Sequence, residues 1–249
     1  MLPTQPFVLF LLSSATQLSL RDGSQIDTGI WAEELLTPWH ALRAQGWPIL
    51  LATPNGLPAQ IDPQSLLPEN LQGDTAKCHR LAQESQQLPL SQALSLPRLV
   101  PLLDGLRGIF IPGGNGPLED LPNSPAVGQL LALARQRTLP VATLCHGSAA
   151  LLARPGPTQD RPFAGFRVSC FQKAEEEDST LAGRWPYHLQ DRLREARFAV
   201  VGGRPWQSFW VADGNLLSGQ NPASALALVA AFAKAMEQFR QRRRSTHGY

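Results

Sequence analysis

A cysteine followed directly by a histidine is the strongest chemical signal in this chain. Cys145 and His146 end an apolar run over residues 140–144, and small residues occupy positions 147–150. A short buried strand that turns sharply into a helix at a nucleophile is the geometry of a nucleophile elbow. The N–H groups at the start of such a helix stabilise a thiolate, and the neighbouring imidazole holds or carries a proton. The stretch therefore predicts a nucleophilic thiol with a lowered pKa.

The competing interpretation of each cysteine is structural, because cysteine is among the residue types most often buried in cores. This interpretation is retained for Cys78 and Cys170, and on the residues of the elbow alone it also stands for Cys145. On the helix that we expect over 74–87, Cys78 is placed on the solvated face. The three cysteines are an odd number without the spacing of a disulfide framework or a zinc site. We therefore expect no metal site and a reducing cytoplasm.

Acidic residues occur in two groups that could act on the thiol. Glu33 and Glu34 precede a Thr-Pro pair at 37–38, which resembles a helix N-cap and first helical residue. Both acids are therefore expected just ahead of that helix or on a kinked first turn, where acids usually serve only as partners of the helix dipole. The acidic run at 175–178 is typical of a solvated loop.

A glycine cluster follows another apolar stretch, over residues 108–111. It contains Gly113, Gly114 and Gly116. Glycines at the carboxyl end of a strand let a ligand approach the backbone closely, and their N–H groups can bind an anion. No Lys-Ser/Thr pair follows, so the cluster does not indicate a phosphate loop.

Length and composition indicate a single globular domain over 1–249. The 249 residues are 43% hydrophobic and 17% charged, which excludes a disordered or fibrous chain. The net charge of +2 argues against nucleic acid as a partner. The apolar run at 7–12 has no Lys or Arg before it and is too short to cross a bilayer, so we interpret it as a buried strand and expect no membrane association.

Apolar runs and turn residues predict an α/β fold with a mostly parallel central sheet. Strands are expected at 7–12, 47–53, 108–111, 139–144, 166–171 and 198–201, with a hairpin at 209–218. Helices are expected from Pro38 to Gly46, over 74–87, 125–137 and 186–196, after the elbow, and from Asn221-Pro222 onward. Residues 57–107 are predicted to form an irregular, partly helical excursion.

In combination, these segments resemble the ThiJ/PfpI superfamily, relatives of the class I glutamine amidotransferases, and within it the heat-shock-chaperone and glyoxalase III branch. The matching stretches are Thr28-Gly29 through Glu34 to Pro38, Phe110 to Gly116, Thr143 to Ala149, the acidic run after Phe171, Asp213 to Asn215, and Gly219 to Ser224. The resemblance covers nearly the whole chain. It implies a flavodoxin-like three-layer sandwich.

The resemblance also implies a set of site residues. Cys145 matches the nucleophile, His146 its histidine, Glu34 rather than Glu33 the acid that hydrogen-bonds the sulfur, and Glu176 the acidic third member. The backbone N–H groups of Gly114 and His146 match the oxyanion donors, and Gly113 is expected to line the substrate. Ser148 departs from the family pattern, which often has proline there. The insertion that forms a lid domain in some relatives is absent or short.

The function implied is a cofactor-independent glyoxalase that converts methylglyoxal or a related 2-oxoaldehyde to a 2-hydroxy acid, D-lactate from methylglyoxal, through a hemithioacetal on Cys145. The partner would then be a small aldehyde, and a homodimer is left open. Two other classes stay open. One is a holding chaperone or redox sensor that uses oxidation of Cys145, and the other is a cysteine hydrolase or an amidotransferase-like acyl-transfer enzyme.

Overall fold

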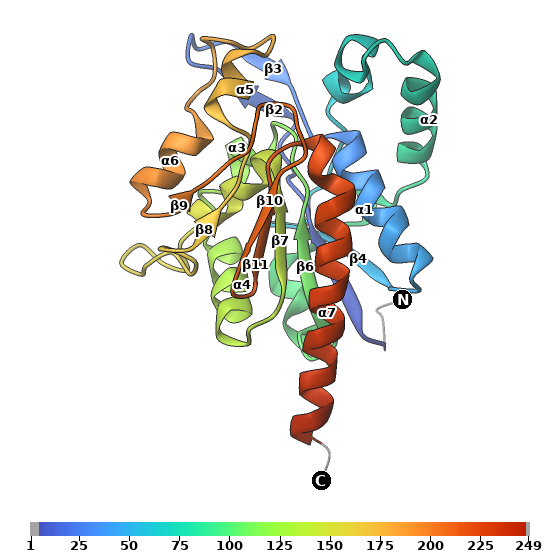
Figure 1. Ribbon diagram of the computed structural model, residues 1–249, viewed down its shortest axis with the longest axis vertical. Helices are drawn as coiled ribbons and strands as arrows, with labels where there is room; N and C mark the ends of the chain where they lie inside the picture. The colour runs from blue at the N-terminus through green and yellow to red at the C-terminus, as the bar shows by residue number, and fades with distance from the viewer. Residues whose placement is uncertain (1–4, 248–249) are drawn as a thin grey trace.

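A mostly parallel sheet forms the centre of the molecule (Figure 1). The computed structural model describes residues 5–247, and within this range seven strands pair in the order β10-β11-β7-β6-β1-β4-β5. The strands are β1 (Phe7–Leu11), β4 (Ile49–Thr53), β5 (Leu94–Ser95), β6 (Leu106–Ile111), β7 (Val141–Leu144), β10 (Trp210–Asp213) and β11 (Leu216–Gly219). All neighbouring pairs are parallel except β10 with β11. The order β4-β1-β6-β7-β11 is the 2-1-3-4-5 order of flavodoxin-like sheets, which confirms the predicted fold class.

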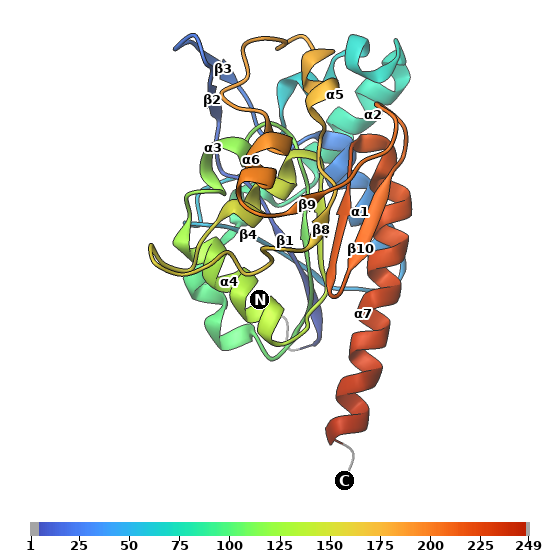
Figure 2. The same cartoon turned by 60° about the vertical axis from the view of Figure 1, so that its left-hand side comes forward.

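Helices cover both faces of the sheet, which explains why its central strands are continuous apolar runs (Figure 2). Helices α1 (Ala32–Ala44) and α7 (Ala225–His247) lie on one face. Helices α4 (Pro125–Gln136) and α6 (Leu189–Glu195) and the 3₁₀ helix η5 (Cys145–Leu152) lie on the other. Alternate residues of β1 divide between the two cores, Val8 and Phe10 facing the first and Leu9 and Leu11 the second.

The excursion at 57–107 is irregular and partly helical, as predicted. It contains the 3₁₀ helices η1 (Pro63–Leu66), η2 (Pro68–Leu71), η3 (Leu90–Gln92) and η4 (Leu96–Leu102), helix α2 (Thr75–Gln86) and the edge strand β5. The Asp74 carboxylate caps α2 by accepting from the Lys77 N–H. The solvated position expected for Cys78 is wrong, because α2 packs against α1 and buries this thiol beside Leu36 and Leu81.

The first helix begins six residues earlier than the Thr-Pro pair suggested. Trp31 is its N-cap, and Pro38 lies inside it. The early start is possible because first-turn N–H groups find acceptors elsewhere in the fold, the Ala32 N–H donating to Ser65 Oγ at 3.1 Å. Glu33 and Glu34 are thus first-turn residues of α1.

Two other elements differ from the prediction. The helix expected after the elbow is the 3₁₀ helix η5. The strand expected at 166–171 is reduced to β8 (Arg167–Val168), which pairs in parallel with β9 (Ala199–Val200) in a separate small sheet. Backbone donors near β8 are held by side chains instead of a ladder, since Ser169 N–H donates to Ser218 Oγ at 2.8 Å.

The remaining elements complete the edges of the molecule. They are the hairpin β2 (Gln17–Ser19) and β3 (Gln25–Asp27), the short helices α3 (Pro117–Asp120) and α5 (Lys173–Glu177), and the 3₁₀ helix η6 (Pro222–Ser224) that leads into α7. Among the described helices α7 is the longest, and none combines the length and hydropathy of a bilayer-spanning segment. A single domain over 1–249 stays a prediction, and its ends at 1–4 and 248–249 lie outside the described residues.

Candidate active site

Cys145 lies at the turn between β7 and η5, at the carboxyl edge of the sheet. Leu144 is extended, with φ −130° and ψ 134°, whereas Cys145 has a φ of 57°, in the left-handed region that side-chain-bearing residues rarely adopt. The chain therefore turns sharply at the thiol itself, as the nucleophile-elbow pattern predicts. Cys145 is nearly buried, with 5% of its surface exposed.

Glu34 reaches the thiol from the first turn of α1. Its side chain is fully buried, and its Oε2 accepts the Gly113 N–H at 2.9 Å. A Cβ atom built on Gly113 would clash with Glu34 Oε2 and lie 2.7 Å from the Cβ of Cys145, so the acid and the cysteine both pack against this glycine and leave no room for a side chain. Glu33 instead points outward and pairs with Lys77 at 2.8 Å. The structure thus places Glu34, not Glu33, beside Cys145.

Burial sets the protonation of both groups. It raises the pKa of the Glu34 carboxyl to about 8, although hydrogen bonding with the Cys145 thiol and the Gly113 N–H acts in the opposite direction. Burial, followed by the charge of Glu34, also raises the pKa of the Cys145 thiol well above its usual range, and the His146 N–H offsets this only in part. The predicted lowering of the thiol pKa is therefore wrong, because desolvation outweighs the donor at the start of η5. At neutral pH the resting site holds a proton on each group.

His146 is buried beside the cysteine and held on three sides. Its ring lies edge-on to Phe171, with centroids 4.8 Å apart, and tilted against Trp185 at 5.1 Å. Its Nε2 is 3.1 Å from Glu176 Oε1, while its Nδ1 is buried without a hydrogen-bond partner among the described residues. A carboxylate on Nε2 favours the Nε2–H tautomer, so Nδ1 carries a lone pair that can accept a proton.

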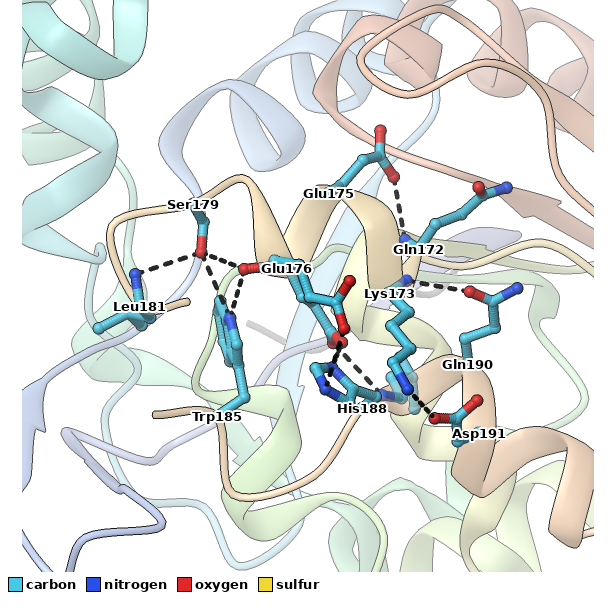
Figure 3. Close-up of polar contacts among 12 residues, drawn as sticks. Gln172, Lys173, Glu175, Glu176, Ser179, Leu181, Trp185, His188, Gln190 and Asp191 are labelled. Carbon is cyan, nitrogen blue, oxygen red and sulfur yellow. Dashed lines mark hydrogen bonds and ion pairs between the residues drawn. The ribbon is translucent and has the colours of Figure 1, made fainter. Parts of the chain in front are cut away.

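Glu176 comes from α5, and of the other three residues in its acidic run, expected to be solvated, Glu175 is instead buried. Glu175 and Glu176 are both fully buried. Glu176 Oε2 lies 2.6 Å from Nδ1 of His188, and Leu189 N–H donates to Oε1 at 3.3 Å (Figure 3). The helix faces inward because a capping box at its start ties the Glu175 carboxylate to the Gln172 N–H.

The two glycines expected near a substrate are used differently. The Gly113 N–H donates to Glu34 Oε2, so it is not available to a substrate. Gly114 has a φ of 100°, and among the described residues its N–H donates to no protein acceptor. The Gly114 N–H therefore remains a free donor among the described residues, whereas Gly113 provides the surface against which Glu34 and Cys145 both pack.

Two residues outside the sequence prediction belong to this arrangement. His188 contacts Glu176, and Glu175 accepts the Trp206 N–H and the amides of Gln220 and Asn221. No motif marks His188, since it lies in a loop just before α6. Two hollows of about 310 and 380 Å³ lie elsewhere on the described surface, and Cys145 lines neither. Within residues 5–247 no group of His, Cys, Asp and Glu could hold a metal ion.

Known proteins are similar to this chain in sequence and fold. The protein/nucleic acid deglycase HchA of Staphylococcus aureus is 27% identical over 227 residues, which cover 88% of this chain and 75% of the relative. Glyoxalase III from Candida albicans shares the fold with a TM-score of 0.72 and 23% identity, over 92% of this chain and 97% of that one. DJ-1beta from Drosophila melanogaster matches with a TM-score of 0.57 and 14% identity, over 96% and 97% of the two chains. No family model matches.

Replacing Glu34 by Gln should change how stability depends on pH. Because the folded pKa of about 8 exceeds the ordinary value of 4.5, the folded state keeps a proton that the unfolded state loses between these values. The free energy of unfolding of the wild type therefore falls as pH rises through this window, by roughly 1.4 kcal/mol per pH unit from this group, whereas Gln does not titrate. Urea unfolding at pH 5, 6, 7 and 8 measures the difference.

The matched control is Glu33→Gln. This acid pairs with Lys77 near the surface, so its loss should change the unfolding free energy by less than about 1 kcal/mol at each pH. If the curves of Glu34→Gln and the wild type run parallel, Glu34 does not carry the buried proton.

Replacing Gly113 by Ala should separate the acid from the thiol. The added methyl group overlaps Glu34 Oε2 and crowds Cys145, so we expect a loss of about 1–3 kcal/mol in unfolding free energy and a loss of the Glu34-dependent pH effect. Gly156→Ala is the control, since that site meets only the flexible end of Gln159. A stable Gly113→Ala protein with an unchanged pH effect would contradict the close packing described here.

Proposed function

We propose that this chain is a member of the ThiJ/PfpI superfamily, in its heat-shock-chaperone and glyoxalase III branch, and that it is a cofactor-independent glyoxalase III-type enzyme. Its substrate is methylglyoxal or a related 2-oxoaldehyde, and its product is the 2-hydroxy acid, D-lactate from methylglyoxal. Cys145 is the nucleophile, and His146, Glu34 and Glu176 complete the site. The observation that carries the proposal is a buried Cys145 that contacts a protonated Glu34 and is followed directly in the chain by a buried histidine whose Nδ1 has no hydrogen-bond partner among the described residues.

The first step is addition of the thiol to the aldehyde. The Cys145 sulfur forms a bond to the aldehyde carbon and its proton passes to His146 Nδ1, which then delivers it to the former carbonyl oxygen to give a neutral hemithioacetal. The N–H groups of Gly114 and His146 stabilise the negative charge that develops on this oxygen. Each such donor contributes roughly 3 kcal/mol to the transition state.

The second step moves a proton from the former aldehyde carbon to the neighbouring carbonyl carbon. A base at the site, His146 or the carboxylate form of Glu34, removes the C1 proton to give an enediol, and reprotonation at C2 gives a 2-hydroxyacyl thioester on Cys145. Water then cleaves the thioester, releasing the hydroxy acid and restoring the thiol. Aldehyde and water become a hydroxy acid with no change in the overall oxidation state, so no redox cofactor is required.

The burial of Cys145 favours a small free aldehyde over a large adduct. The name of the Staphylococcus aureus relatives describes action on protein and nucleic acid. With 5% of Cys145 exposed and Trp206 lying against Phe171 at 5.5 Å, a macromolecular adduct has less access to this thiol than methylglyoxal has.

The experiment is formation of D-lactate from methylglyoxal in the absence of glutathione. The wild type should consume the aldehyde, and Cys145→Ser should lose at least about 1000-fold in kcat/KM while remaining folded, because a hydroxyl is a far weaker nucleophile at neutral pH. Chiral product analysis identifies D-lactate, and circular dichroism checks the fold.

Cys170→Ser and Cys78→Ser are the matched controls, since both are also buried free thiols and both should be dispensable for turnover. Turnover by folded Cys145→Ser, or consumption of glycated peptide faster than methylglyoxal by the wild type, would reject the proposal.

A further inference from the structure

Glu176 joins two imidazoles, one of which, that of His188, has no role in the proposed reaction. Its Oε1 lies 3.1 Å from His146 Nε2, and its Oε2 lies 2.6 Å from His188 Nδ1. Figure 3 shows His188 directed at the Glu176 carboxylate from the loop that leads into α6. The two rings therefore share one buried carboxylate, with His146 on the side of Cys145 and His188 on the side of solvent.

The two oxygens of Glu176 depend on different donors. Oε1 receives His146 Nε2–H and the Leu189 N–H, whereas the hydrogen-bond donor of Oε2 among the described residues is His188 alone. The nearby cation Lys173 pairs with Asp191 at 3.1 Å instead. Since an ionised carboxylate oxygen left unpaired in the interior is strongly destabilising, removal of His188 would drive the carboxylate to rotate or to take up a proton.

Either response would remove the constraint on which nitrogen of His146 carries the proton. If the Glu176 carboxylate rotates or is protonated, its Oε1 becomes a weaker acceptor for the Nε2–H of His146. The His146 imidazole could then carry its proton on Nδ1 instead. That nitrogen is buried without a hydrogen-bond partner among the described residues, and in the proposed mechanism it must be free to accept a proton.

We propose that His188 is a positioning residue of this site, which, by holding Glu176, fixes His146 in the Nε2–H tautomer and keeps Nδ1 free as the base. The side chain of His188 is 24% exposed, and its Nε2 lies 3.9 Å from the exposed Glu177, so this imidazole forms the outer end of the chain of contacts. The kinetic consequence rests on the proposed glyoxalase function, whereas the tautomer of His146 does not.

Two substitutions separate the hydrogen bond from the bulk of the ring. His188→Asn places an amide N–H near the position of Nδ1 and keeps the donor to Glu176, whereas His188→Leu keeps the volume and removes the donor. We expect His188→Leu to lower kcat for methylglyoxal by about 10-fold or more with KM changed less than about two-fold, and His188→Asn to restore most of kcat. His40→Asn is the matched control, because His40 makes an imidazole–carboxylate contact with Glu84 at 3.2 Å on the surface.

Ring ¹⁵N chemical shifts of His146 test the positioning without substrate. The Nε2–H tautomer is expected in the wild type, in His188→Asn and in His40→Asn, and a mixture of tautomers in His188→Leu. If His188→Leu fails to fold, His188→Ala takes its place with the same expectation.

An unchanged His146 tautomer together with an unchanged kcat in folded His188→Leu overturns the inference, as does an equal loss of kcat in the Asn and Leu variants. A wild type that forms no hydroxy acid would remove the proposed function, and the tautomer measurement would still decide the role of His188.

Discussion

Close approach of backbone segments at Gly113 and Gly114 is the constraint on which the site depends. These two glycines follow the end of β6, and they are packed against the start of α1 and the turn at Cys145. Neither position has room for a side chain. The Gly113 carbonyl accepts the Trp31 N–H at 3.1 Å, and its own N–H donates to Glu34. A Cβ on Gly114 would lie 2.5 Å from the Trp31 nitrogen. Glycine at these two positions therefore sets the distance between acid and thiol, which no rotamer choice of Glu34 or Cys145 could set alone.

This packing also decides the electrostatics. A carboxyl and a thiol brought together without water cannot both ionise, so burial raises the pKa of each, and the pair rests with both protons in place. The His146 imidazole is arranged in the opposite way, with a carboxylate on Nε2 and an Nδ1 that has no hydrogen-bond partner among the described residues. The site thus combines a group that holds a proton, Glu34, with a group that can accept one, His146. Such a division suits a reaction in which the thiol adds to a carbonyl and loses its proton at the moment of attack.

Much of this arrangement could be predicted from the sequence, because it depends on local patterns. The apolar runs of β1, β6 and β7, the cap of α4 at Ser124 and the turn at Cys145 are all encoded within a few residues. The protonation of Cys145 and the start of α1 could not be predicted in this way. The first depends on desolvation by distant segments, and the second on Ser65, 33 residues away in the chain, which accepts an N–H of the first helical turn.

The acidic run shows most clearly where sequence patterns stop being informative. Adjacent acids usually face solvent, yet Glu175 and Glu176 both point inward because polar donors from distant segments converge on them. Glu175 Oε1 accepts the Asn221 amide at 2.7 Å and the Trp206 N–H at 2.8 Å, which fixes the loop that brings Trp206 against Phe171. The Glu176 carboxylate contacts both His146 and His188. One turn of helix therefore organises both the loop that brings Trp206 against Phe171, which lies beside His146, and the hydrogen bond that orients the His146 ring.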